Sequence, residues 1–121
     1  MHNPRLNNIS SPSHLEKVLT ESIERKAVSY FVFCSPWDKV SKHLVTSLME
    51  QGQVEDQPLY LIDLFEIPQA IQIFKSVINK IKPTMNLSTL KYHKVPQMIV
   101  MHKAFPRVVD YNGAIYAELG L

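Results

Sequence analysis

The pattern of apolar and polar positions divides the chain into alternating strands and helices. Val28–Cys34 is an almost unbroken run of apolar and aromatic residues, which is typical of a fully buried strand. Pro36 ends this run, and Asp38 follows at a position suited to a helix N-cap. Beyond it, four apolar residues are spaced so that they share one helix face: Val40, Leu44, Val45 and Leu48. The pattern therefore predicts a buried strand, a tight turn and an amphipathic helix.

The residues before this strand carry the signals of a first helix. Ser11-Pro12-Ser13 supplies an N-cap and a proline in the first turn, and Glu16 completes a capping box. Apolar residues then form a stripe at helical spacing: Leu15, Val18, Leu19 and Ile23. A helix is predicted for about Pro12–Arg25. Met1–Ser10 is rich in asparagine and proline and is predicted to be a flexible arm or an edge strand.

The second half of the chain contains two more predicted strands and a long helix. Leu59–Leu64 is an apolar strand, and apolar residues keep helical spacing over Pro68–Lys82 until the next proline. Thr84–Lys94 has no clear period and is interpreted as an insertion. The strand Val95–Val100 follows it. In the last segment, Asn112-Gly113 is a type I′ turn signal, which predicts a hairpin rather than a helix.

At Trp37 the sequence resembles the thioredoxin family. The residues F-C-S-P-W-D-K-V-S-K align without a gap on the family's F-W-A-x-W-C-G-P-C-K and match it at Phe33, Trp37 and Lys42. In this register Asp38 and Ser41 take the positions of the two active-site cysteines. Dithiol exchange needs a nucleophilic thiolate and a resolving thiol. The resemblance thus implies a scaffold that has lost this chemistry.

Two weaker matches extend the resemblance. Ile62-Asp63 with Glu66-Ile67-Pro68 resembles the V-D-x-D-E-N-P junction that leads into the third thioredoxin helix. Val95-Pro96 resembles the family's cis-proline loop, which faces the active-site turn and offers backbone groups to a bound peptide. Phe105-Pro106 is an alternative for the cis-proline role, because the Val108–Leu119 segment that follows contains Asn112-Gly113, a hairpin signal that resembles the family's N-G turn.

The resemblance implies an α/β fold in one domain, residues 1–121. A mixed sheet of four or five strands with helices on both faces is expected. Because the sequence stops at Leu121, after the predicted hairpin, the C-terminal helix of the family is expected to be missing. Part of one apolar sheet face would then be uncovered, which soluble monomers seldom tolerate. A homodimer is therefore expected as one way to cover it.

A second register lays Cys34-Ser35-Pro36-Trp37 on C-G-P-C and leaves Cys34 as a lone nucleophile. It places Val45 on the outer helix face and Lys39 on the inner one, so the first register is preferred. The leading hypothesis is a non-catalytic protein that binds a protein partner. The contact residues would lie in the turn and in the proline loop: Trp37, Asp38, Ser41, Val95 and Pro96. The alternative is a single-cysteine thiol-disulfide oxidoreductase acting through Cys34.

Composition narrows the classes of function that remain possible. The chain has 121 residues, 45% of them hydrophobic, and a formal charge of +2 with scattered basic residues, so nucleic-acid binding is not expected. One cysteine excludes an intramolecular disulfide, and no apolar run approaches a membrane span, so a soluble, cytoplasmic protein is expected. No cofactor motif occurs. The histidines lack metal-ligand spacing, so no metal site is expected: His2, His14, His43, His93 and His102.

Overall fold

The computed structural model describes residues 6–25, 28–51, 57–81, 87, 90–92, 94–102, 105–110 and 112–119. Its elements are β1 (Leu6–Ile9), α1 (Pro12–Arg25), β2 (Ser29–Cys34), α2 (Lys39–Gln51), β3 (Leu59–Asp63), α3 (Ala70–Ile81), β4 (Gln97–His102), β5 (Phe105–Val109) and α4 (Asn112–Glu118). The five strands form one sheet in the order β1-β3-β2-β4-β5. The pairs β1–β3 and β2–β3 are parallel, whereas β2–β4 and β4–β5 are antiparallel. The predicted mixed α/β sheet is confirmed.

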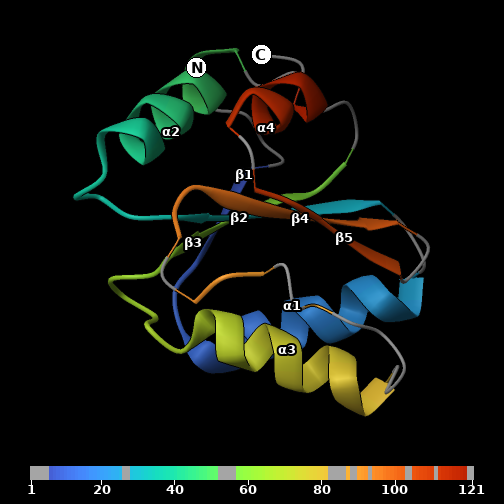
Figure 1. Ribbon diagram of the computed structural model, residues 1–121. Coiled ribbons are helices and arrows are strands. Elements are labelled where there is room, and N and C mark those ends of the chain that lie inside the picture. The colour runs from blue at the N-terminus through green and yellow to red at the C-terminus, as the bar shows by residue number, and fades with distance from the viewer. Residues whose placement is uncertain are drawn as a thin grey trace.

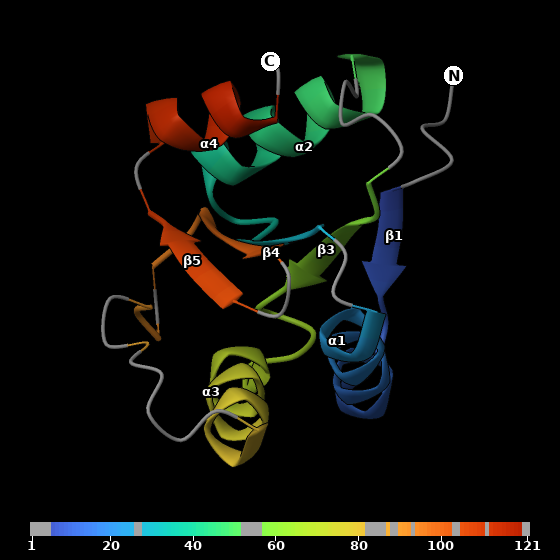
Figure 2. The ribbon, with the colours of Figure 1, turned by 90° about the vertical axis from the view of Figure 1, so that its right-hand side faces the viewer.

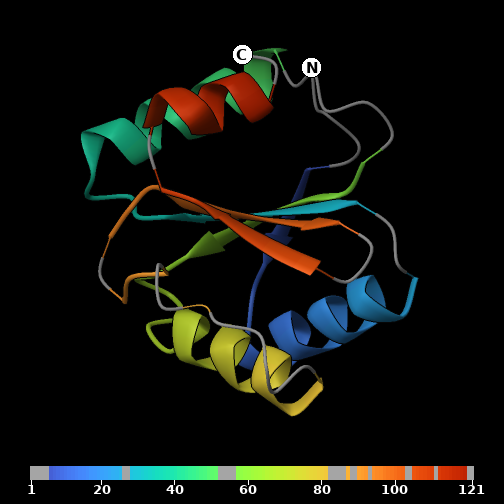
Figure 3. The ribbon, with the colours of Figure 1, turned by 45° about the vertical axis from the view of Figure 1, so that its right-hand side comes forward.

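Helices cover both faces of this sheet. Helices α1 and α3 lie on one face, and α2 and α4 lie on the other, so the molecule has three layers (Figures 1 and 3). Turned by 90°, the same layers are seen with β1 and β5 at opposite edges of the sheet (Figure 2). No helix among the described residues is long and apolar enough to cross a membrane.

The central strand β2 contributes side chains to both layers of the core, because successive residues of a strand point to opposite faces. Phe31 and Phe33 pack in the cluster beneath α1 and α3, and Phe74 of α3 meets both rings edge to face. Val32 points the other way, into the cluster formed with α2 and α4. This two-sided burial explains why β2 is an apolar run rather than an alternating one.

The first two helices begin at the residues that the sequence predicts. The backbone amide of His14 donates to the Ser11 hydroxyl over 3.2 Å, which caps α1. In α2, Leu44 and Leu48 are buried and Val45 is half-buried against the same cluster. Val40 is exposed, however, and Ser41 is buried in its place. The predicted apolar stripe was therefore displaced by one residue at its start.

The prediction of a C-terminal hairpin at Asn112-Gly113, and of a missing final helix, was wrong. Asn112 begins helix α4, whose Ile115, together with the following Leu119, is buried in the α2 cluster. Asparagine is also a favoured residue where a helix begins, and the spacing of Ile115 and Leu119 is helical. The uncovered sheet face, on which the expected homodimer rested, is therefore covered by α4.

The predicted insertion, Thr84–Lys94, is described only in part. Leu87 and Leu90 are buried in the cluster beneath α1 and α3. The rest of this prediction lies mostly outside the described residues. These two leucines of the segment therefore contribute to the core, whereas Lys91, Tyr92 and Lys94 are exposed.

Candidate functional site

Strand pairing brings together three connections that are distant in the sequence, at the end of the sheet where β2 and β3 finish and β4 begins. Cys34 at the end of β2 pairs with Asp63 at the end of β3, and Phe33 pairs with Gln97 at the start of β4. The β2–α2 turn, the β3–α3 turn and the Val95–Pro96 loop therefore begin or end side by side, on the left in Figure 1. The residues predicted for the site from separate parts of the sequence share this end of the sheet.

The turn before α2 is held by its own polar groups. The backbone amides of Trp37 and Asp38 donate to the hydroxyl and the carbonyl of Ser35, over 3.3 and 3.2 Å. The carboxylate of Asp38 then accepts a hydrogen bond from the backbone amide of Ser41 at 2.8 Å. Asp38 is thus the N-cap of α2, as predicted.

Trp37 projects from this turn into solvent and meets a second exposed aromatic residue. Its side chain is 76% exposed and that of Phe65 is 63% exposed, and their ring centroids lie 5.8 Å apart at an interplanar angle of 75°. Phe65 is positioned by Asp63, because the Asp63 carboxylate accepts a hydrogen bond from the backbone amide of Phe65 at 2.8 Å. Sequence analysis missed Phe65. Its position immediately after a strand end, between Asp63 and Pro68, was the available signal.

Ser41 does not lie on the surface, although it was predicted as a contact residue. It is fully buried on the inner face of α2, and its hydroxyl oxygen has no hydrogen-bond partner among the described residues. Its side chain is therefore removed from any surface that a partner could touch.

The peptide bond between Val95 and Pro96 is cis. Pro96 is buried and Val95 is half-buried, so Val95 is the residue of this pair that is partly exposed to solvent. Pro106, the alternative proline, lies inside β5 opposite Met101. It is therefore at neither of the two turns described above.

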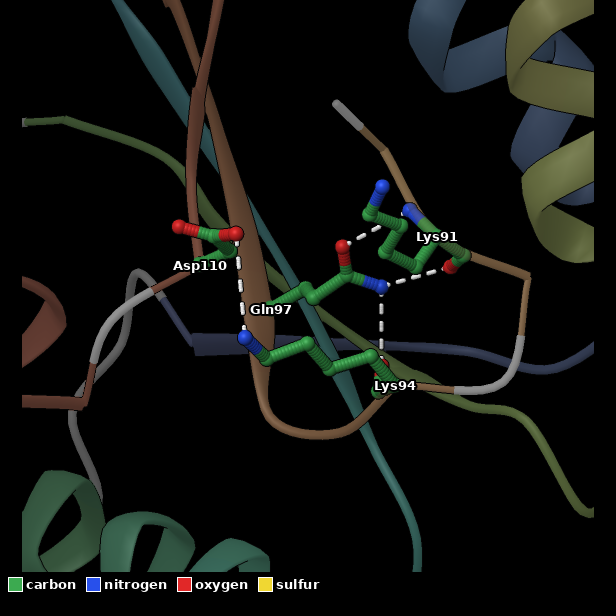
Figure 4. A network of polar contacts seen from close by, with 4 residues as sticks. All are labelled: Lys91, Lys94, Gln97 and Asp110. Atoms are coloured by element: carbon green, nitrogen blue, oxygen red, sulfur yellow. Dashed lines mark hydrogen bonds and ion pairs between the residues drawn. The ribbon is translucent and has the colours of Figure 1, made fainter. Parts of the chain in front are cut away.

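Gln97 holds the chain that leads into this loop, and sequence analysis missed it as well. Its side-chain oxygen accepts the Lys91 amide at 2.9 Å, and its side-chain nitrogen donates to the carbonyls of Lys91 and Lys94 at 2.6 and 2.8 Å (Figure 4). Lys94 also reaches Asp110 at 3.7 Å. The amide is fully buried, so these bonds replace those that it would make with water. A glutamine following a proline gives no sequence signal for such a role.

Cys34 lies beneath the site with its thiol turned inward. It is 8% exposed, and its Sγ donates weakly to the carbonyl of Ile62 over 3.5 Å. Burial raises the pKa of the Cys34 thiol to about 12, with a further contribution from the negative charges of Asp63 and Glu66. The thiol is therefore protonated at neutral pH, and the nucleophilic thiolate is scarce.

The described residues include no group of three or more histidine, cysteine, aspartate or glutamate side chains placed to hold a metal ion. The chemistry of this end of the sheet is instead that of an exposed aromatic pair, a capped helix start and a loop tied down by hydrogen bonds. Such a surface can bind another molecule, but its described side chains include no reactive nucleophile.

Comparison with known proteins identifies the fold. No family model matches the sequence, and no curated protein matches it significantly. Among solved structures, a thioredoxin from Nicotiana alata matches with a TM-score of 0.71 at 11% identity, covering 98% of this chain and 92% of that one. An oxidised thioredoxin from Arabidopsis thaliana matches with a TM-score of 0.66 at 14% identity, covering 98% of both chains. A thioredoxin from Fasciola hepatica matches at 0.65 and 8%, covering 94% of this chain and 96% of that one. The chain has the thioredoxin-like fold.

Proposed function

We propose that this protein is a non-catalytic thioredoxin-like protein that binds a protein partner through its exposed turn. The contact surface consists of Trp37, Phe65, Asp38 and the Val95–Pro96 loop. The single observation that carries the proposal is the Trp37–Phe65 pair, two large aromatic side chains that touch each other and remain mostly exposed. Exposed tryptophan and other large aromatic side chains concentrate the binding energy of protein interfaces.

The surroundings of the pair support a binding surface. Asp63 and Ser35 fix the backbone of the two turns that carry the rings, and Gln97 fixes the loop beside them. A surface held in one conformation loses less conformational entropy on association than a mobile one. The site is therefore organised before a partner arrives.

The sequence and the thiol chemistry support a non-catalytic function. The chain has one cysteine, so it cannot complete an intramolecular dithiol exchange. The raised pKa of Cys34 and its burial also leave the single-cysteine oxidoreductase without a specific observation in its favour. We expect no reduction of insulin disulfides above the rate in buffer.

The experiment that tests the proposal compares two phenylalanines at opposite ends of the sheet. Phe65 lies at the proposed surface, and Phe105, 58% exposed, is the first residue of β5. It pairs with His102 at the far end of β4, where β4 also pairs with the start of β2. Proteins that bind the wild type are identified and purified. Their affinities for the wild type and for Trp37→Ala, Phe65→Ala and Phe105→Ala are then measured by calorimetry.

We expect Trp37→Ala and Phe65→Ala each to weaken a genuine partner by at least about tenfold, as interface hot spots do. Phe105→Ala should leave its affinity unchanged. Equal affinities for all four proteins would mean that the partner binds elsewhere. Insulin reduction at a rate comparable to a dithiol thioredoxin would contradict the non-catalytic function directly.

A further inference from the structure

A groove of about 490 Å³ opens between the start of α2 and the β1–β3 side of the sheet. Its lining comes from the ends of three parallel strands and from α2, with Ile9, Cys34, Asp63 and Ser41 as one residue from each. Trp37 and Phe65 are not part of the lining. The groove is therefore a feature separate from the proposed partner surface.

The topology explains why a groove forms here. After β2 the chain turns to the face that holds α2, whereas after β1 and β3 it turns to the opposite face, which holds α1 and α3 (Figures 1 and 3). Connections that leave neighbouring parallel strands toward opposite faces open a crevice at the carboxyl ends of those strands. Ligands of α/β proteins bind at this switch point.

The size and walls of the groove suit a small organic molecule. Its volume falls in the range of about 300 to 1,000 Å³ that is typical of ligand pockets. Ile9, Val45 and Leu61 supply apolar wall, while Asn8 and Thr46 add polar groups. An apolar body of modest size would therefore be accommodated.

The charges of the lining favour a cation. Asp63 and Glu66 bring two negative charges and Lys42 one positive charge, which leaves a net charge of −1 for the lining. Neither carboxylate has an ion-pair partner within the described part of the chain. Both negative charges contribute to the raised pKa of the Cys34 thiol at the floor of the groove. An ammonium group would be attracted to this end of the groove.

Ser41 provides an independent sign of an unfilled polar interaction. Its hydroxyl is buried without a partner among the described residues, and Ser41 belongs to the groove lining. A buried hydroxyl without a hydrogen bond is costly, so most are satisfied by protein, water or ligand. Ser41 therefore marks a buried polar atom in the lining whose hydrogen bond the described residues do not supply.

From this combination we infer that the groove binds a small amphiphilic amine. The apolar part lies against Ile9, Val45 and Leu61, and the ammonium group lies toward Asp63 and Glu66. This inference goes beyond partner binding and does not depend on it.

The test uses the whole chain and 2-phenylethylamine as the probe. Its binding is followed by amide chemical shifts in NMR and compared with that of 2-phenylethanol and 3-phenylpropionate, which replace the cation by a neutral and an anionic group. We expect saturable shifts at Ser41, Lys42 and Asp63 for the amine, affinity about fivefold lower for the alcohol, and no saturable binding of the carboxylate.

Matched variants assign the effect to the groove. Asp63→Asn retains an acceptor for the Phe65 amide, and Glu66→Gln changes an exposed side chain, so both should fold. We expect each to weaken amine binding by about fivefold, and Thr46→Trp, at an exposed lining position, to block it. Glu24→Gln, an exposed acid of α1 outside the groove, is the control and should change nothing.

Three results would overturn the inference. The first is the absence of saturable amine binding up to the solubility limit. The second is carboxylate binding as tight as amine binding, because the lining would then not select for a cation. The third is unchanged amine affinity in both Asp63→Asn and Glu66→Gln, with folding verified by their NMR spectra.

Discussion

The carboxylate of Asp38 accepts the backbone amide of Ser41 at 2.8 Å, so the two residues aligned with the thioredoxin cysteines are joined by a helix cap. A cap satisfies an amide that has no partner within the helix, and it places a negative charge at the positive end of the helix dipole. The position that carries an activated thiol in a dithiol enzyme therefore has a structural role here.

Removing this cap should destabilise the fold. We expect Asp38→Ala to lower the free energy of unfolding by about 1 kcal/mol, because the Ser41 amide loses its partner. Asp38→Asn should retain most of the stability, since its amide oxygen can accept the same bond. Urea unfolding measures both, and equal losses in the two variants would mean that charge rather than capping matters.

Removing the unpartnered hydroxyl of Ser41 should stabilise the fold, in contrast to removing the Asp38 cap. We expect Ser41→Ala to raise the free energy of unfolding by about 1 kcal/mol, because it removes a buried polar atom without a hydrogen bond. The matched control is Ser22, which is also buried but hydrogen-bonds to Ser29. Ser22→Ala should destabilise by about 1 kcal/mol. Destabilisation by Ser41→Ala in urea unfolding would show that its hydroxyl is satisfied in solution.

Restoring both thiols tests the alignment. Asp38→Cys combined with Ser41→Cys places cysteines at the N-cap and one turn into α2, the arrangement that lowers a thiol pKa and permits a disulfide. We expect the double variant to form that disulfide and to reduce insulin weakly, whereas each single variant should not. Mass spectrometry and the insulin assay provide the measurements, and thiols that fail to pair would refute the register.

The raised pKa of Cys34 predicts a loss of stability in alkaline solution. The folded protein holds a proton, up to pH about 12, that the unfolded chain releases above about pH 9, so the unfolded state binds fewer protons in this window. The stability contributed by the protonated thiol is complete below pH 9 and falls by up to about 1.4 kcal/mol per pH unit above it. Cys34→Ala lacks this titration.

Urea unfolding at a series of pH values checks this expectation. The stability difference between wild type and Cys34→Ala should be constant from pH 6 to 8 and should shift against the wild type above pH 9. Tyr30 and Tyr60, whose pKa values are also raised by burial, are present in both proteins and cancel. A constant difference throughout, or rapid native reaction with a thiol reagent, would contradict a buried, protonated Cys34.

Gln97 should order the loop before Pro96. We expect Gln97→Leu to lower the free energy of unfolding by about 1 to 2 kcal/mol, because three hydrogen bonds to Lys91 and Lys94 are lost. Hydrogen exchange of the Lys91 amide should accelerate in this variant. Gln72→Leu, on the exposed side of α3, is the matched control and should affect neither measurement. Unchanged exchange at Lys91 would mean that the loop is held by other contacts.

Much of the fold could be predicted from local sequence signals. The N-cap at Ser11, the apolar run of β2 and the helical spacing in α3 each report a preference that the tertiary structure does not oppose. Asn112-Gly113 shows where such signals fail, because asparagine suits both a tight turn and a helix start. Packing of Ile115 and Leu119 against α2 decides between them, and that contact is not encoded locally.

The site was harder to predict than the fold. Trp37 and Asp38 could be found because one short motif contains both. Phe65 becomes part of the site only when the pairing of Cys34 with Asp63 brings its turn beside Trp37. Ser41 was assigned to the surface because it aligns with the second thioredoxin cysteine, whereas packing turns the serine inward. These errors share one cause, since each depends on strand register or helix rotation.

Pro106 has a consequence for how copies of this protein meet. It lies in β5, the outermost strand, and proline in a sheet is confined to edge strands, with its nitrogen turned to solvent. A further strand arriving at this edge would find a pyrrolidine ring instead of an amide donor, beside the charged side chain of Arg107. Such features are used by natural sheets against aggregation through their edges. The β5 edge is therefore protected against fibril-like growth of the sheet from one molecule to the next.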